Sequence, residues 1–393
     1  MRILTVDVGT GTQDIYLYDS RLDIENGFKL ILPSPTMIVH RRIRQAMLAR
    51  TPILLRGHQM GGGPSAWAAE AHARAGIPIY ATQDAARTLN DELEKVAALG
   101  IKILSEDEAD RLPSSVMRVD FLDFDFGAIA QAFAAFGVSL AGLDAVAVAV
   151  FDHGAAPPGV SDRQFRFDYL DRRLRERNRL SAFAYPATEI PSSLSRLQAV
   201  AASATSLDCP LVVMDTAPAA VLGATFDPAV GKRRRKLIVN VGNFHTLAFR
   251  LGEGGATEGM GIEGVFEHHT GEIDLAKLES LLRALAAGSL RHEDVFNDMG
   301  HGAIVYSQEP LEIGKDEFDV IVTGPRRSMF QGATADPALH LRPYFAVPFG
   351  DMMIAGCFGL LAAAADVLPG VREVVQASLY GAGGRAIAPW DIE

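Results

Sequence analysis

The chain has 393 residues, of which 48% are apolar and 22% are charged. This length exceeds one ordinary core and favours two domains, and the composition excludes a disordered chain, a coiled coil and a collagen-like repeat. An excess of 48 acidic over 37 basic residues gives a net charge of −11, which argues against nucleic acid as a partner.

The elements, taken from the N-terminus, predict an α/β protein. Residues 2–8 are apolar, residues 9–12 form a Gly/Thr turn, and residues 15–18 return as a second strand, which predicts a hairpin. Further strand-like runs lie at residues 53–55, 77–81, 145–151, 211–214, 237–241 and 320–322. Helical stretches lie at residues 64–75, 129–136 and 274–287, the last with Asp274 as its expected N-cap. This alternation predicts largely parallel sheets.

Three connecting segments have no clear periodicity. We expect residues 33–56 to close the first sheet, because they mix proline, arginine and apolar residues. Residues 155–179 begin with Pro-Pro-Gly turn chemistry and become basic and polar, which predicts an exposed excursion. The basic run at residues 232–236 is typical of a solvated loop.

The first motif with chemical content is Asp7-Val-Gly-Thr-Gly-Thr-Gln-Asp14. The backbone N–H groups of Gly9 and Gly11 and the hydroxyls of Thr10 and Thr12 offer donors to phosphate oxygens. Asp7, at the end of the incoming strand, suits a magnesium ion held through water. The motif is neither a dinucleotide fingerprint nor a P-loop, and an ordinary glycine-rich hairpin tip is the alternative.

A second segment at residues 236–249 repeats this plan: an apolar strand, a polar residue, a glycine turn and another apolar strand. Its candidate phosphate-binding residues are Asn240, Gly242, Asn243 and Thr246. Two such hairpins, far apart in the sequence, are expected to act as a pair of phosphate clamps.

With these two hairpins, the chain resembles the actin-like ATPases, a superfamily that includes sugar kinases, acetate kinase and the heat-shock chaperone ATPases. Three further segments fit that resemblance in order. Residues 215–224 and 349–359 are similar to the two small-residue crossing helices, and residues 318–327 resemble the adenosine loop, with Gly324 and Arg326 at the nucleotide. Asn240 departs from the acid that is usual in the chaperone ATPases.

The resemblance implies a fold and a ligand. The fold is two actin-like (ribonuclease H-like) α/β domains around a nucleotide cleft. Domain I would comprise residues 1–215 plus 349–393, with the first hairpin and the crossing helices. Domain II would comprise residues 230–348, with the second hairpin and the adenosine loop. The implied cofactors are ATP and Mg²⁺.

The segments DVGTGTQD, VNVGNFHT and EHHTG also resemble a family labelled as pyruvate formate-lyase activating enzymes. Radical activation by S-adenosylmethionine uses a cluster held by three thiolates. The sequence has two cysteines, Cys209 and Cys357, so one chain cannot supply them. We therefore expect the chain to match the family that carries this label, but not to catalyse radical activation.

Three residues are candidates for acid–base or substrate contacts. Asp152 follows a buried strand at the sheet edge where ligands collect, and we expect it to act as general base, with a loop-capping aspartate as the alternative. Glu267 is the second candidate for that role, and His268 is a candidate for substrate or catalytic contact, with a structural role as the alternative. His268 and His269 would face opposite ways on a strand, which argues against one metal between them.

The sequence therefore predicts an ATP-dependent phosphotransferase or ATPase acting on a small molecule. The alternative is a nucleotide-switched activator of a partner enzyme, and a catalytically inactive scaffold is the third possibility. We expect a cytoplasmic protein with no membrane partner, because the N-terminus carries Asp7 within its first apolar stretch, unlike a signal peptide. The longest uncharged apolar run, residues 352–365, is also shorter than the roughly 20 residues that span a bilayer.

Overall fold

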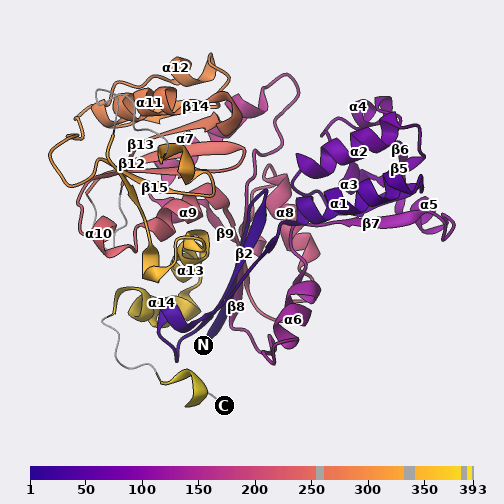
Figure 1. Cartoon of the computed structure of the whole chain (residues 1–393), viewed down its shortest axis with the longest axis horizontal. Helices are drawn as coiled ribbons and strands as arrows, with labels where there is room; N and C mark the ends of the chain where they lie inside the picture. The colour runs from indigo at the N-terminus through magenta and orange to yellow at the C-terminus, as the bar shows by residue number, and fades with distance from the viewer. Residues whose placement is uncertain (254–260, 332–340, 382–386, 392–393) are drawn as a thin grey trace.

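The computed structural model describes residues 1–253, 261–331, 341–381 and 387–391, which form a mixed α/β structure with three sheets (Figure 1). The first sheet has the order β3-β2-β1-β8-β10-β9. Its strands are β1 (Arg2–Val8), β2 (Thr12–Asp19), β3 (Phe28–Pro33), β8 (Ala145–Val150), β9 (Ala184–Pro186) and β10 (Leu211–Asp215). Every residue of β8 is buried, as expected of a central strand that is parallel to both neighbours.

The second sheet has the order β14-β13-β12-β11-β15-β16. Its strands are β11 (Lys236–Val241), β12 (His245–Leu251), β13 (Ile262–His269), β14 (Gly302–Val305), β15 (Val320–Thr323) and β16 (Pro343–Phe345). In both sheets three consecutive antiparallel strands are followed by parallel ones: β1-β2-β3 with β8 and β10, and β11-β12-β13 with β15 and β16. The two predicted hairpins therefore hold equivalent places. The sheets are mixed rather than largely parallel.

A third sheet, which the sequence did not lead us to expect, is entirely parallel, with the order β6-β5-β4-β7. Its strands are β4 (Ile53–Gly57), β5 (Ile79–Thr82), β6 (Lys102–Leu104) and β7 (Met117–Phe121). Its helices are α1 (Pro35–Leu48), α2 (Pro64–Arg74), α3 (Gln83–Ala86), α4 (Leu93–Ala98) and α5 (Glu106–Asp110). Residues 33–56 thus begin this sheet instead of closing the first one. Figure 1 shows it set to one side of the other two.

Two helices made largely of small residues, α9 (Thr216–Ala224) and α13 (Ala355–Val367), cross at close range between the first two sheets. A Cβ on Gly223 would overlap the carbonyl of Ala355, and one on Gly359 would overlap that of Ala219. α9 contacts strands of both sheets. α9 coincides with the predicted crossing segment at residues 215–224, and α13 begins within the other, at residues 349–359, and extends beyond it. The division into domains I and II stays a prediction.

The segment predicted as an exposed excursion instead contains a half-buried helix, α7 (Asp162–Glu176). Arg166, Phe167 and Leu170 on its inner face are almost completely buried. The remaining helices are α6 (Phe126–Ala134), α8 (Ser195–Ser203), α10 (Pro228–Gly231), α11 (Leu275–Ala287), α12 (His292–Phe296) and α14 (Pro369–Tyr380). Short 3-10 segments lie at Ile24–Asn26, Leu180–Phe183, Ala187–Glu189, Thr270–Glu272, Arg327–Phe330, Pro348–Gly350 and Pro389–Asp391. Asp274 caps α11 as predicted, accepting from the backbone N–H of Lys277 at 2.8 Å.

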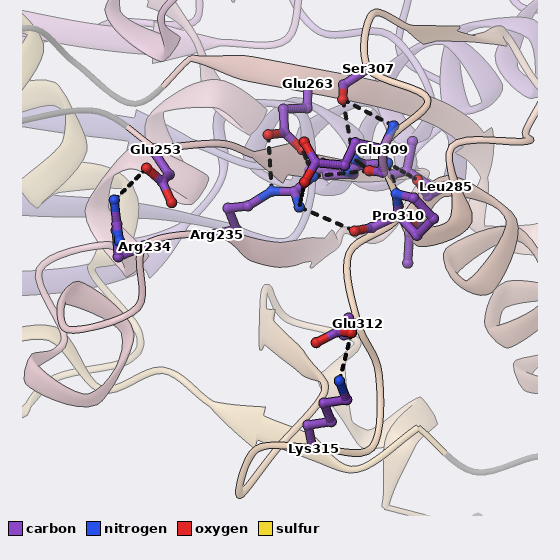
Figure 2. Close-up of polar contacts among 12 residues, drawn as sticks. Arg234, Arg235, Glu253, Glu263, Leu285, Ser307, Glu309, Pro310, Glu312 and Lys315 are labelled. Atoms are coloured by element: carbon purple, nitrogen blue, oxygen red, sulfur yellow. Dashed lines mark hydrogen bonds and ion pairs between the residues drawn. The ribbon is translucent and has the colours of Figure 1, made fainter.

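The three arginines of the basic run at residues 232–236 form ion pairs with acids, while Lys232 and Arg234 are exposed to solvent, as predicted. Figure 2 shows Arg234 with Glu253, and Arg235 with Glu263. Lys236 is buried and donates to the carbonyl of Val230 at 3.0 Å. No helix within the described ranges is both long and apolar enough to cross a bilayer.

Candidate functional site

A cavity of about 950 Å³ lies where the two hairpins face each other. It is lined by the hairpin tips, the loop after β15, the first turns of α9 and α13 and two loops of the third sheet. The corresponding residues are 9–12, 242–245, 323–325, 216–217, 355–356, 59–63 and 87–92.

The two hairpin tips have the same backbone turn. In the first, the N–H of Gly9 donates to the carbonyl of Thr12 at 2.9 Å. In the second, the N–H of Gly242 donates to the carbonyl of His245, also at 2.9 Å. Each turn leaves its two middle N–H groups without a backbone acceptor among the described residues: those of Thr10 and Gly11, and those of Asn243 and Phe244. Two pairs of free donors are thus presented at the cavity.

The tips also come close to each other and to the third sheet. A Cβ placed on Gly11 would lie 3.1 Å from Nδ2 of Asn243. One on Gly63, whose φ is +61°, would lie 2.6 Å from the ring of Phe244. Trp67 of α2 meets that ring edge-on, with centroids 5.7 Å apart. Glycine is favoured at position 63, because its φ is positive and its backbone lies against the Phe244 ring.

Two carboxylates face the cavity from the first hairpin. Asp7 and Asp14 are opposite each other in the β1–β2 register, and both line the cavity. Thr216 donates to Oδ1 of Asp7 at 2.5 Å, whereas Oδ1 of Asp14 is buried with no hydrogen-bond partner among the described residues. Burial raises the pKa of Asp7 to about 6. Burial and then the charge of Asp7 raise the pKa of Asp14 to about 7.

Four predicted nucleotide-binding residues remain; two of them lie at the cavity and two do not. Asn240 and Gly324 line it. Gly324 has φ +98°, and a Cβ there would lie 2.5 Å from Oδ1 of Asn240. Thr246 is fully buried and shares a hydrogen bond with Thr270 at 2.9 Å, so it faces away. Arg326 is exposed and outside the cavity wall; Arg327 is the arginine that lines it.

Asp152 lies at the cavity, but both of its carboxylate oxygens already accept hydrogen bonds. Oδ1 accepts from the N–H of Gly154 at 2.8 Å, and Oδ2 accepts from the N–H of Leu197 at 2.9 Å. Burial raises the pKa of Asp152 despite these bonds. The geometry is that of an aspartate that fixes a loop and the first turn of α8.

Glu267 is fully buried behind the cavity wall, in contact with an arginine that the sequence did not single out. Arg166 of α7 donates to Oε2 of Glu267 at 2.6 Å and to Oδ2 of Asp215 at 2.7 Å. Burial works to raise the pKa of Glu267, but the charge of Arg166 and the neighbouring His301 and His245 together hold the pKa well below its usual range. Glu267 is therefore ionised.

His268 points away from the cavity, because it lies between Glu267 and His269 on strand β13 and faces the opposite side. Its two ring nitrogens lie 3.0 Å from the carbonyl oxygens of His269 and Asp298. On the cavity side, His153, His245 and His301 form a cluster. Burial lowers the pKa of His301 to about 3 and that of His153 well below its usual range.

Sequence reasoning left Asp14, Arg166 and His301 without a role. Asp14 could have been found, because hairpin pairing places it opposite Asp7. Arg166 and His301 carry no local signal. The cysteines do not meet: Cys357 is buried with its sulfur near the carbonyls of Thr5 and Asp14, whereas Cys209 is partly exposed on the loop before β10.

Comparison with known proteins gives one family. The model of the family described as "Putative pyruvate format-lyase activating enzyme (DUF1786)" matches residues 60–329. No curated protein matches the sequence significantly. Among solved structures, the chain is similar to the crystal structure of an exopolyphosphatase-like protein, at 10% identity and a TM-score of 0.27. The match covers 98% of this chain and 93% of that one.

Proposed function

The chain belongs to the family that carries the pyruvate formate-lyase activating label, and from that premise we propose that it binds magnesium–ATP between its two hairpins, as an actin-like phosphotransferase or ATPase. The observation that carries this proposal is the pair of identical turns at the cavity, each with two free N–H groups. Such groups of backbone donors bind phosphate oxygens.

The phosphates would lie between the two tips. Thr10 and Gly11 would donate from one side and Asn243 from the other, because a Cβ placed on Gly11 would lie 3.1 Å from Nδ2 of Asn243, so the two tips lie side by side. Gly9, Thr12 and Gly242 complete the turns. The loop at Gly324 would border the adenosine, with Arg327 in the place expected for Arg326.

The residues at the floor of the cavity fit a magnesium ion. Asp7 and Asp14 bring two carboxylates together, and one oxygen of Asp14 has no partner among the described residues. Hard cations such as Mg²⁺ prefer carboxylate oxygen and water. Asp7 would hold the ion through water, with Asp14 beside it. When bound, the ion would neutralise charge on the phosphate oxygens.

Calorimetric titration with magnesium–ATP tests this proposal. We expect saturable binding that requires Mg²⁺ and weakens in Asp7→Asn. The matched control is Asp125→Asn, which alters an aspartate outside the cavity at the start of α6 and should bind as the wild type does. No binding at millimolar nucleotide would remove the proposal.

One observation favours the second candidate, a nucleotide-switched activator of a partner enzyme. Of the described acids at the cavity, Asp152 and Asp123 are occupied, by backbone N–H groups and by Arg196 respectively. The second hairpin has Asn240 where an acid is usual. If no other acid takes the role predicted for Asp152, the site would hydrolyse ATP slowly, which suits a switch.

Turnover separates the two candidates. A phosphotransferase consumes ATP only with an acceptor, whereas a switch binds ATP, changes conformation and hydrolyses it slowly alone. If Asp152 is nonetheless the base, Asp152→Asn should leave nucleotide affinity intact and reduce turnover by roughly 10²–10⁴. Unchanged turnover would clear Asp152 of this role.

A further inference from the structure

We propose that His153, His245 and His301 form a Zn²⁺ site in the wall of the cavity. The three residues come from the loop after β8, the start of β12 and the residue before β14. One ring nitrogen from each lies within 4.8 Å of those of the other two. This inference concerns the chain's own histidines and does not depend on ATP binding.

The polar atoms of this cluster are not satisfied by the protein. The Nδ1 atoms of His245 and His301 lie 3.1 and 3.5 Å from Oε1 of Glu267. None of these three buried atoms makes a well-oriented hydrogen bond with another described residue. Buried polar atoms are paired in almost all structures, so the protein alone leaves this cluster incompletely satisfied. A Zn²⁺ ion on the opposite ring nitrogens would fix both Nδ1 atoms as N–H donors facing Glu267.

Glu267 supplies the support that metal-bound histidines usually have. A carboxylate commonly orients a ligating imidazole from the nitrogen that faces away from the metal. Oε1 of Glu267 lies beside the Nδ1 atoms of His245 and His301. Arg166 holds Oε2 of the same carboxylate at 2.6 Å. Glu267 and Asp215 share this one guanidinium, which leaves one excess negative charge beside the histidines.

The imidazoles are also held in place by packing. Phe151 stacks on His245, with centroids 4.1 Å apart and planes at 18°. The ring of His153 stacks on that of His301 at 5.3 Å and 19°. The backbone N–H of His301 donates to the carbonyl of Glu267 at 2.9 Å. Side chains that are already held in place lose little conformational entropy when they bind an ion.

Three imidazoles and no thiolate suit Zn²⁺ and disfavour Mg²⁺, which prefers oxygen ligands. Zinc–nitrogen bonds of about 2.1 Å place tetrahedral ligand nitrogens about 3.4 Å apart. Nitrogens separated by the full 4.8 Å would therefore move about 1.4 Å closer together. His153 and His245 line the cavity, so a fourth coordination position would open toward it. Three protein ligands with one open position are typical of a catalytic rather than a structural zinc.

The test uses the full chain, stripped with a chelator and dialysed. Titration with ZnCl₂ against a chromophoric chelator should give one Zn²⁺ per chain, and excess Mg²⁺ should not displace it. His153→Gln and His245→Gln should each weaken binding by about 100-fold or more, and Glu267→Gln by about 10- to 100-fold. Co²⁺ in place of Zn²⁺ should give the visible absorption of a tetrahedral site.

The matched control is His58→Gln, since His58 is a half-buried histidine outside the cluster; it should bind as the wild type does. Equal affinity in the wild type and both cluster variants, or equal weakening in the control, would overturn the proposal. His153 is partly exposed at the cavity, so its variant keeps the test decisive even if the Glu267 variant fails to fold. Zinc binding without ATP binding would refute only the nucleotide proposal.

Discussion

At the scale of single residues, the cavity concentrates charge that is costly to the folded state. Asp7 and Asp14 face each other across a hairpin, and burial raises the pKa of both. An oxygen of Asp14 is buried without a partner among the described residues. Two buried carboxylates that face each other are expected where a cation binds, because the positive ion neutralises their charge.

We predict that Asp14→Asn stabilises the protein at pH 8. The pKa of Asp14 is about 7 in the folded state and near 4 when unfolded, so the folded state binds more protons between these values. Stability from this group is therefore full at pH 4 and is lost as the pH rises to 7. The variant should gain about 2 kcal/mol at pH 8, allowing for water in the cavity, and nothing at pH 4.

Urea unfolding at both pH values measures this difference. The exposed Glu94→Gln serves as the control and should show no such dependence. Added Mg²⁺ should stabilise the wild type more than the Asp14 variant. Equal stability of wild type and variant at pH 8 would contradict the prediction.

At the scale of elements, α7 and the crossing helices position the site. The sequence of α7 looks polar, yet its inner face carries Arg166, which connects β10 to β13 through Asp215 and Glu267. The crossing of α9 and α13 brings Thr216 and Gly356 to Asp7. A Cβ on Gly356 would overlap the Asp7 carboxylate, so only glycine fits there.

Arg166→Met should destabilise the protein by about 3–5 kcal/mol, because it leaves two buried carboxylates without their cation. Arg175→Ala, on the same helix, is the matched control. Its ion pair with Asp171 is largely exposed on the arginine side, so its removal should change the free energy of unfolding far less than Arg166→Met does. Chemical denaturation compares the two, and similar losses would show that Arg166 does not hold the carboxylates together.

Gly223→Ala should cost about 2 kcal/mol or more, because the added methyl would overlap the Ala355 carbonyl and force α9 and α13 apart. Gly370→Ala is the control: nothing lies within 4 Å of a Cβ at this position of α14. That change should stabilise the helix by about 0.5–1 kcal/mol. Thermal unfolding of both variants measures these effects, and a neutral Gly223 variant would mean that the crossing can relax.

At the scale of the whole molecule, the third sheet touches the second hairpin through Trp67 and Phe244. Figure 1 shows this sheet to the side of the other two, and its loops supply one wall of the cavity. A ligand between the hairpins therefore has all three sheets around it.

This contact makes Trp67 a reporter of ligand binding. The chain has two tryptophans, so Trp390→Phe isolates the emission of Trp67, whose side chain is partly exposed. We expect magnesium–ATP to shift this emission to shorter wavelength, because closure around the ligand would exclude water from the ring. Phe244→Leu should reduce the shift. If calorimetry detects magnesium–ATP binding but the emission of Trp67 does not change, the third sheet does not move when the nucleotide binds.

The sequence alone determined the local parts of this protein. Periodicity and turn chemistry act between near neighbours, and they predict the hairpins at Gly9–Thr12 and Gly242–His245, the buried strand β8 and the capped helix α11. Short motifs indicated the family. Only the tertiary structure decided which distant residues meet. His153 and His301 lie almost 150 residues apart, and Arg166 reaches Glu267 across 101 positions. It also decided that the oxygens of Asp152 accept backbone N–H groups and that residues 33–56 begin a separate sheet. Such contacts depend on how sheets pack, which no local pattern records.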